Sequence, residues 1–593
     1  MNNISGNNKN NNNKGHSFAK GAFIITLGML AVKFFGAVFK IPLMSILGGE
    51  GSAYFVGAYN FYSPIYALST AGLPIAISKL VAENAALGRF RDVRKIRRIS
   101  VPIFLITGTI GFLLVAIGSF VYAKISKAPD SVYSVIMLAP ALLFSCLMSS
   151  HRGYYEGLRN MTPTAVSEVI ESLGKIIFGL SLSYLTIWLG TREYQKNHTI
   201  FGVYYNNIVK ANGKLLAFAS AAAILGIAIS AAVGFLYIYM RYKIKGDNIT
   251  KQELINSPRP RNSKKILKEI IKISMPIGLG AIVMNLAGVI DSILVQRRLA
   301  DITLNSLDKL KNIYGSLIPN EALIRNNVHL FLSGCFGFTS TITMFLPTIA
   351  MGLAVSTLPS VTTAWTLGEK KNIKKSIEKI LKITSIISIP MGFGVSSLAL
   401  PILDLIYNTL HSGEHIGEII IGSQIMTVSG IGAIFIAFSM PICSMLQAIG
   451  RADLPLKILS IGVLIKIFLN YILVGIPEIN IQGAAIGTLA CYIFVFTCAL
   501  IALFRNTKIK INFVSIFIKP CFAGLICAFS ANLFYKFLSQ NINSKISTII
   551  SIILSAIIYF ITIFLLKIIT KEELESDKRT KKISKIFKKF KFI

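Results

Sequence analysis

Long apolar segments alternate with short polar segments along almost the whole chain. Runs of about 20 apolar residues, the length that crosses a bilayer as a helix, recur about fourteen times. The predicted spans are residues 18–46, 54–82, 99–123, 131–156, 163–190, 214–240, 268–298, 328–365, 377–407, 418–448, 455–475, 481–505, 512–537 and 544–570. This pattern predicts an all-α polytopic membrane protein.

Composition supports a membrane protein. Of the 593 residues, 53% are hydrophobic, and the mean hydropathy of +0.64 is far above that of soluble proteins. The Asn-rich head at 1–16 is polar and predicted to be disordered. We expect no cleavable signal, because the first apolar run is longer than the core of a signal peptide.

The formal net charge of +35 is distributed unevenly among the loops. Segments rich in Lys and Arg follow even-numbered spans: 89–98, 241–272, 370–382 and 567–591. The loops 47–53, 411–417 and 475–481 contain neither residue. The positive-inside rule therefore predicts cytoplasmic termini, in agreement with an even number of spans. The positive charge then indicates topology and attraction to anionic lipid headgroups, and we expect no nucleic acid partner.

Cysteine and histidine form no recognisable metal or disulfide pattern. The seven cysteines lie mostly in apolar runs without a C-x-x-C pair, and the six histidines include no H-E-x-x-H motif. We expect neither a metal site nor a cofactor. No phosphate-binding Gly-Lys-Ser loop or nucleophile elbow occurs in a polar segment long enough to fold, so the chain is not expected to be an enzyme. An intramembrane transferase remains an alternative.

Two sequence features recur in the same order in the two halves of the chain. Residues 71–88 and 351–368 share an outline that runs from Gly-Leu to Leu-Gly, followed by a basic segment. In each half a proline also stands four residues after an arginine, at Arg159 and Pro163 and at Arg451 and Pro455. Because both matches lie on the predicted cytoplasmic side, the halves are predicted to be parallel repeats of six spans each.

The repeat predicts the domain organisation. The predicted parts are a disordered cytoplasmic head at 1–16, an N-lobe at 17–240, a basic cytoplasmic linker at 241–267, a C-lobe at 268–505, two appended spans within 506–570 and a basic tail at 571–593. Apolar residues in the tail recur with helical spacing between lysines. The tail is predicted to be an amphipathic helix on the anionic inner leaflet, with a frayed, solvated tail as the alternative.

Charged residues inside the spans mark candidate sites, because an ammonium group near the bilayer centre costs about 2.5 to 3.5 kcal/mol on insertion scales. Lys33 and Lys40 are seven residues apart in the first span, so they fall on nearly one helix face. Together they could line a cavity for an anionic cargo. Alternatively, Lys40 extends to the interface and Lys33 pairs with an acid on another helix.

A second group of charges occurs in the fifth span. Glu168, Glu171 and Lys175 share one helix face, and Glu171 precedes Lys175 in the favourable i, i+4 order. One interpretation is a self-neutralised structural patch. The other is that Lys175 and Lys466, in corresponding spans of the two lobes, face a common cleft. Asp291 could neutralise a cavity lysine or bind a coupling proton or sodium ion.

Four stretches resemble a known family: AGLPIAISKLVAENAALG at 71–88, RGYYEGLRNMTPTAVSEVIESLGK at 152–175, SMPIGLGAIVMNLAGVIDSIL at 274–294 and LQAIGRADLPLKI at 446–458. They are similar to the polysaccharide-biosynthesis and stage V sporulation protein B group of the multidrug, oligosaccharidyl-lipid and polysaccharide (MOP) exporter superfamily. The resemblance implies fourteen helices in two lobes, alternating access and a place in the bacterial cytoplasmic membrane. The implied cargo is an undecaprenyl-pyrophosphate-linked precursor, with lipid II for vegetative peptidoglycan or spore cortex as the first candidate.

The lipid II flippase lineage of this superfamily has basic residues in span one. Lys33 in KFFG matches the first of them, and Lys40 in FKIP lies one residue from the second. The chain departs from the lineage at 338–343, where FTSTIT replaces an Asp-Arg pair, and after span one, where Glu50 is the acid close by. Alternatives are another lipid-linked oligosaccharide, such as a capsule or teichoic-type polymer, or drugs moved by a cation-coupled antiporter.

An expected pyrophosphate-linked cargo implies roles for the charged residues in the spans. The predicted pyrophosphate-binding residues of the cleft are Lys33, Lys40, Lys79, Arg152, Lys175 and Lys466. Charge balance or coupling is assigned to Asp291, Glu168 and Glu171. Membrane potential, H⁺ or Na⁺ could drive the cycle. The expected partners are the lipid-linked glycan, membrane lipids and cell-wall synthesis or sporulation machinery, and the chain is expected to be a monomer.

Overall fold

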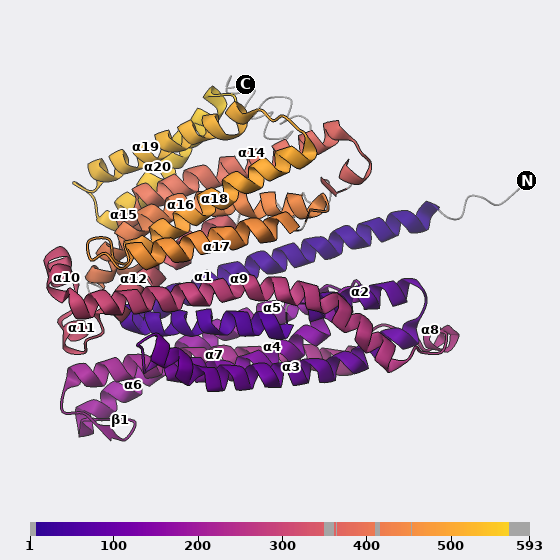
Figure 1. The fold of residues 1–593 in the computed structure, drawn as a ribbon, viewed down its shortest axis with the longest axis horizontal. Helices are drawn as coiled ribbons and strands as arrows, with labels where there is room; N and C mark the ends of the chain where they lie inside the picture. The colour runs from indigo at the N-terminus through magenta and orange to yellow at the C-terminus, as the bar shows by residue number, and fades with distance from the viewer. Residues whose placement is uncertain are drawn as a thin grey trace, which may run out of the picture. The chain divides into compact units, whose positions relative to one another are not determined.

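The computed structural model describes residues 8–70, 72–348, 361–362, 364–408, 415–451 and 453–568 (Figure 1). Side chains are described for these residues except 8–30, 33, 276, 277, 279–284, 286 and 287. The chain forms two compact units. The first contains Met1–Ala300 and Asn320–Gly334, and the second contains Asp301–Pro319 and Cys335–Ile593.

The first unit is a helical bundle with one small hairpin. Its helices are α1 Asn8–Thr70, α2 Leu73–Ala86, α3 Phe90–Ile125, α4 Ser131–Gly157, α5 Thr162–Gly174, the π-helical turn η1 Lys175–Gly179, α6 Leu180–Asn197, α7 Ile208–Lys245, α8 Lys251–Asn256, most of α9 Ser263–Asn305 and α11 Asn320–Ile324. Strands β1 Thr199–Ile200 and β2 Val203–Tyr204 pair antiparallel. Helix α12, Val328–Thr343, begins in this unit and continues into the second.

Small side chains let the helices of the first unit pack closely. Ala219, Ala223, Gly226 and Ser230 follow one another at helical spacing on α7, and all four are buried. A Cβ atom added to Gly226 would lie 2.5 Å from the backbone nitrogen of Gly179, at the end of η1. Such contacts between small residues bring backbones close in membrane helices. The π turn at Lys175–Gly179 therefore packs directly on α7.

Helix α1 covers the first predicted span and the second up to Thr70, and it is broken by a kink between them. Gly48 has φ 60° and ψ −171°, a conformation that glycine adopts without steric cost. A Cβ atom added to Gly334 would lie 1.7 Å from the carbonyl oxygen of Gly49, so α12 passes directly over the kink. The predicted loop at 47–53 is thus a kink within a long helix.

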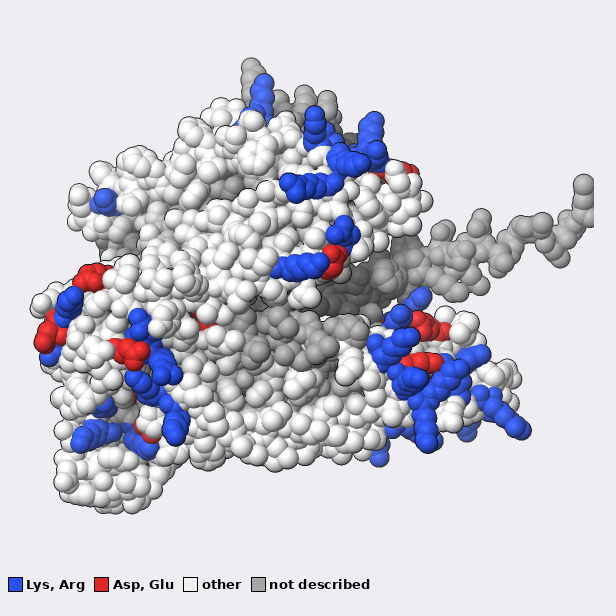
Figure 2. All heavy atoms as spheres, viewed as in Figure 1, with Lys and Arg blue, Asp and Glu red and all other residues white. Residues whose placement is uncertain are grey.

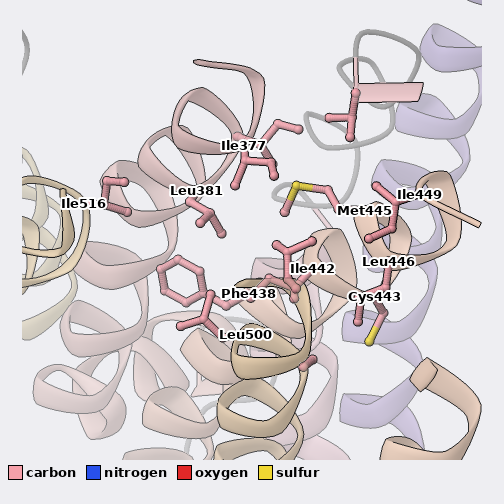
Figure 3. Packing of buried hydrophobic residues seen from close by; sticks show 14 of the residues in the cluster. Ile377, Leu381, Phe438, Ile442, Cys443, Met445, Leu446, Ile449, Leu500 and Ile516 are labelled. Carbon is pink, nitrogen blue, oxygen red and sulfur yellow. The ribbon is translucent and has the colours of Figure 1, made fainter. Parts of the chain in front are cut away.

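The second unit is also helical. Its helices are α10 Leu307–Tyr314, the 3₁₀ turn η2 Gly315–Leu317, α14 Lys370–Ser397, α15 Ala399–Leu403, the π turn η3 Asp404–Asn408, α16 Ile416–Ala448, α17 Asp453–Leu473, α18 Gln482–Thr507, the π turn η4 Val514–Ile518, α19 Lys519–Leu538 and α20 Ser544–Leu565. Figure 3 shows Leu381, Phe438 and Ile442 in the core formed by α14, α16 and α18. All three are less than 4% exposed, so apolar packing joins these helices.

The prediction of an all-α membrane protein is confirmed. Twelve helices of the described residues are long and apolar enough to cross a membrane. One of the twelve covers Phe34–Ala86, on both sides of the α1 kink, and α9 is not among them. The number fourteen therefore stays a prediction.

Some predicted boundaries differ from the structure. The predicted disordered head includes residues 8–16, which form the first turns of α1. A helix nucleated in the following apolar segment extends at little cost per residue, which accounts for this difference. The predicted span 328–365 contains α12, which ends at Thr343. The repeat feature at 351–360 and the tail at 571–593 lie outside the described residues.

The two units do not coincide with the predicted lobes. Linker residue Arg261 forms ion pairs with Asp92 of α3, at 3.3 Å, and with Glu269 of α9, at 3.1 Å. These contacts join the linker and α9 to the first unit, although α9 contains the first predicted span of the C-lobe. The lobes are defined by the sequence repeat and not by packing, so the repeat itself stays a prediction.

Candidate functional site

Charge gathers at the ends of the helices in the first unit. Figure 2 shows Lys and Arg over α2 and α8 at one end of this unit and a second group at the opposite end. The described side chains between them on this face are nearly all uncharged. Charged side chains within the helices are therefore exceptions that need partners or a function.

Three predicted site residues meet inside the first unit. Glu171 of α5 lies between Arg152 of α4, with Oε2 3.2 Å from Nη2, and Lys175 of η1, with Oε1 2.7 Å from Nζ. The side chains of Arg152, Glu171 and Lys175 are 15%, 16% and 28% exposed. We call these three residues the ion triad. The predicted pairing of Glu171 with Lys175 is confirmed, and Arg152 joins it from another helix.

Local structure holds the triad in place. Arg152 Nε donates a hydrogen bond to Ser167 Oγ, at 2.8 Å, and Ser167 in turn donates to the carbonyl of Thr164. Lys175 is the first residue of the π turn, and such turns often occur at functional sites because they shift side chains out of α-helical register. The triad is thus fixed by one side-chain hydrogen bond and two ion pairs.

The triad carries more positive than negative charge. Arg152 and Lys175 supply two cations, and Glu171 supplies one carboxylate. Glu168, one turn before Glu171 on α5, is partly buried and would balance the charge when ionised. Two cations that share one carboxylate keep hydrogen-bond donors for an additional anion. This arrangement can bind an anionic group among the helices of the first unit.

A row of tyrosines on α1 adjoins the triad. Neighbouring rings of Tyr59, Tyr62 and Tyr66 have centroids 6.3 Å and 5.5 Å apart. Tyr59 interacts electrostatically with Lys175, and Tyr66 with Glu171 and Arg152. The sequence analysis did not identify this row, although the spacing of the tyrosines places them on one helix face. The row adds hydroxyl groups and aromatic surface beside the cations.

The remaining predicted residues lie apart or outside the described side chains. The side chain of Lys33 is not described, whereas Lys40 is exposed on α1. Lys79 is 58% exposed on α2 and lies 3.8 Å from Glu83 one turn later. The ion pair of Lys79 is therefore a surface pair within one helix.

Asp291 and Lys466 belong to different units. Asp291 is partly buried on α9 in the first unit, and Lys466 is partly buried on α17 in the second. The interpretation that Lys175 and Lys466 face a common cleft concerns both units and stays a prediction.

The sequence analysis did not predict a buried ion pair near the α1 kink. Glu50 Oε2 lies 2.6 Å from Arg325 Nη2, and the two side chains are 4% and 9% exposed. Asn327 donates to Glu50 at 2.5 Å, and Arg325 donates to the carbonyl of Val209 at 2.8 Å. Glu50 stood out in the sequence as a loop acid, but its partner is far away in the chain. No local pattern could have found this pair.

Profiles of two families match the chain. The profile of the polysaccharide biosynthesis protein family matches residues 18–315, and the MatE profile matches residues 334–472. The lipid II flippase MurJ of Bacillus subtilis (strain 168) is 25% identical over 488 residues, which cover 80% of this chain and 81% of that protein. Stage V sporulation protein B of the same strain is 23% identical over 574 residues, which cover 94% and 97%.

Solved structures share the fold. An inward closed lipid II flippase MurJ has a TM-score of 0.58 at 14% identity and covers 92% of this chain and 98% of its own. An inward-facing MATE family multidrug resistance transporter of the MOP superfamily also reaches 0.58, at 16% identity, with coverage of 82% and 100%. Among these relatives, MurJ is named a flippase and the MATE protein a transporter, and neither is named an enzyme. The profile of the polysaccharide biosynthesis protein family extends over half of the residues of this chain. The chain therefore belongs to the polysaccharide biosynthesis protein family.

Proposed function

We propose that the chain flips an undecaprenyl-pyrophosphate-linked cell-wall precursor across the bacterial cytoplasmic membrane by alternating access, with lipid II as the first candidate. The family, and relatives named as a lipid II flippase and a sporulation protein, support a lipid-linked cargo. The observation that carries the proposal is the ion triad, in which Arg152 and Lys175 share the single carboxylate of Glu171.

The chemistry of the triad suits a pyrophosphate. Guanidinium and ammonium groups form short, charge-assisted hydrogen bonds with phosphate oxygens, and these bonds are stronger where water is scarce. When the site is empty, Glu171 compensates both cations and so prevents an unpaired buried charge. A bound pyrophosphate then shares Arg152 and Lys175 with Glu171. The polyprenyl tail of the cargo stays in the surrounding lipid.

Other charged residues act in the rest of the transport cycle. Lys33, Lys40 and Lys79 attract the headgroup on the cytoplasmic side, and Lys466 contributes from the second unit. Asp291 and Glu168 balance charge or bind a coupling ion, and membrane potential, H⁺ or Na⁺ drives the return step. The termini are cytoplasmic. Cell-wall synthesis or sporulation machinery supplies the cargo or receives it.

Another lipid-linked oligosaccharide would use the same triad, because it shares the pyrophosphate. A drug antiporter of the same superfamily is the third candidate. Cationic drugs favour an acidic lining, and the triad has two cations for one carboxylate. The excess of one cation within the triad itself supports an anionic cargo, although Glu168 beside it would balance that charge when ionised.

The first test is rescue of a bacterium depleted of its own lipid II flippase. We expect rescue by the parent chain and loss of rescue with Arg152→Gln or Lys175→Gln. The matched control is Lys457→Gln, which removes the same charge from a side chain that is 72% exposed on α17. Rescue by both triad variants at normal expression would contradict the proposed site.

A second measurement identifies the cargo. Purified protein in liposomes is supplied with fluorescent lipid II or with an undecaprenyl-linked capsule precursor, and the accessible fraction of each is followed over time. Faster flipping of lipid II supports the first candidate. Flipping of the capsule precursor alone would replace lipid II by the second candidate, and flipping of neither would contradict the proposed function.

A further inference from the structure

A cluster of arginine, tyrosine and histidine lies at one end of the first unit and shares no residue with the ion triad. It is formed by the first turns of α3 and the last turns of α4 and α7. Its members are Arg97, His151, Tyr154, Tyr155, Arg241 and Tyr242. We call it the arginine–tyrosine cluster. The proposed flipping mechanism uses none of these residues.

Arg97 is held in place by the cluster without a carboxylate. Its guanidinium carbon lies 3.3 Å from the centroid of the Tyr242 ring, so the two groups stack. Its Nη2 lies 3.3 Å from Nε2 of His151, whose Nδ1 contacts the carbonyl of Leu147 at 3.1 Å. If Nδ1 of His151 carries the proton, Nε2 accepts from Arg97. These contacts orient the guanidinium but leave its charge uncompensated.

Arg94, three residues before Arg97 on α3, differs from Arg97 because a carboxylate neutralises its charge. Asp247 accepts hydrogen bonds from both Nε and Nη2 of Arg94, at 2.9 Å and 3.0 Å, and from the hydroxyl of Tyr154, at 3.0 Å. Arg97 and Arg241 form no ion pair of this kind with any acid in the described ranges of the chain. Positive charge therefore exceeds negative charge in the cluster.

Both arginines have buried nitrogen atoms without an acceptor among the described residues. These are Nε of Arg97 and Nη1 of Arg241. Leaving a buried charged donor unsatisfied costs more than about 1 to 3 kcal/mol, so such groups normally have a partner. Arg97 stacks on Tyr242, the residue that directly follows Arg241, so both arginines lie at the last turns of α7. An oxyanion there would satisfy both donors.

We propose that the arginine–tyrosine cluster binds the phosphate of an anionic phospholipid headgroup. Phosphate accepts several charge-assisted hydrogen bonds and matches the planar donors of arginine. The apolar side chains of Leu236 and Met240, within the last turns of α7 before Arg241, are 54% and 49% exposed. A lipid with its headgroup on Arg97 and Arg241 can lay its acyl chains against them. This apolar surface selects a lipid over a soluble phosphate.

The test compares two double variants that lose the same charge. Arg97→Gln with Arg241→Gln removes both cluster donors, and Arg98→Gln with Lys243→Gln removes two exposed cations from the same helices. Each protein is purified in detergent and titrated with phosphatidylglycerol, phosphatidylcholine or inorganic phosphate. Bound lipid is counted by native mass spectrometry. Circular dichroism and size-exclusion chromatography check that each variant is folded.

We expect the cluster variant to bind phosphatidylglycerol at least about tenfold more weakly, because it loses more than 1.4 kcal/mol of charge-assisted bonding. The control variant should change less than about twofold, as exposed charges contribute little. Equal weakening in both variants would overturn the site and leave only general charge attraction. Equal binding of phosphatidylcholine would overturn the preference for an anionic headgroup, and displacement of the lipid by inorganic phosphate would overturn the assignment to a lipid.

A single variant keeps the test valid if the cluster variant does not fold. Arg241→Gln removes Nη1, which has no acceptor among the described residues, so the loss of this donor breaks no hydrogen bond there. This variant should retain the circular dichroism of the parent and bind phosphatidylglycerol several-fold more weakly. Unchanged binding would overturn the role of Arg241 and with it the proposed site.

Discussion

At the scale of single residues, the first unit contains two kinds of ion pair. Glu50 and Arg325 are nearly inaccessible, at 4% and 9% exposure, whereas Lys79 and Glu83 are more than half exposed. Loss of one partner of a buried pair leaves an uncompensated charge, which costs several kcal/mol. An exposed pair contributes about 0 to 1 kcal/mol. Burial thus decides how much each pair matters.

A double-mutant cycle should reveal this difference. We expect Glu50→Gln to destabilise the protein by about 3 kcal/mol, since Arg325 then stays buried without its counter-ion. The double variant Glu50→Gln with Arg325→Gln should recover part of that loss, which gives a coupling energy above about 1 kcal/mol. The measurement is thermal unfolding in detergent.

The matched control cycle uses Lys79→Gln and Glu83→Gln, an i, i+4 pair in α2. Its coupling energy should stay below about 0.5 kcal/mol. Equal coupling in the two cycles would mean that the Glu50–Arg325 pair does not stabilise the region of the α1 kink.

At the scale of elements, the π turn η1 depends on how closely it packs on α7. Gly226→Ala places a methyl group 2.5 Å from the backbone of Gly179. Backbone cannot move aside cheaply, so we expect a loss of about 1 to 3 kcal/mol and reduced transport, because η1 carries Lys175. Thermal unfolding and the liposome flipping assay measure the two effects.

Gly36→Ala is the control for this glycine. A Cβ atom at Gly36 would have no neighbour within 4 Å, and alanine favours the helix. The control should be neutral or slightly stabilising. Full stability of Gly226→Ala would indicate that η1 and α7 are not in close contact.

The linker after α7 depends on pH through Asp247. Burial by itself raises the pKa of Asp247, but hydrogen bonds from Arg94, from the Ile249 N–H and from Tyr154 outweigh it and hold the pKa below its ordinary value. A depressed pKa contributes stability that is present above the unfolded value, about 3.9, and is lost as pH falls through the folded value. Acid should therefore release the linker from α3.

Asp247→Asn should remove this pH dependence. We expect the variant to melt below the parent at pH 7, and the difference in melting temperature to shrink as the pH falls toward 3. Asp308→Asn, at an exposed position of α10, serves as the control and should melt with the parent at each pH. A difference for Asp247→Asn that grows in acid would contradict the sign of the shift.

At the scale of the whole molecule, the distribution of basic loops predicts which segments face the cytoplasm. Cysteines introduced in place of exposed Glu478 and Lys251 test the two sides with a membrane-impermeant maleimide. We expect Glu478→Cys to react in intact cells and Lys251→Cys to react after permeabilisation. The parent chain, with its seven free cysteines, provides the background. The reverse labelling pattern would overturn the predicted topology.

Much of the fold could be predicted from the sequence, because hydropathy and helix formation depend on residues that are close together in the chain. Apolar runs of bilayer length predict the spans, and the predicted span 418–448 contains nearly all of α16, Ile416–Ala448. The kink at Gly48 and the extent of α12 escaped prediction. The kink packs against a segment that is distant in the chain, because Gly334 of α12 lies over Gly49.

The sequence by itself determined the class of protein, the helices and the pair formed by Glu171 and Lys175, because hydropathy and i, i+4 spacing act over one or a few helical turns. Only the tertiary structure decided that Arg152 joins this pair, that Tyr59 and Tyr66 adjoin it, and that Arg325 neutralises Glu50. Those partners come from different helices, and the packing of small residues between helices decides which side chains meet.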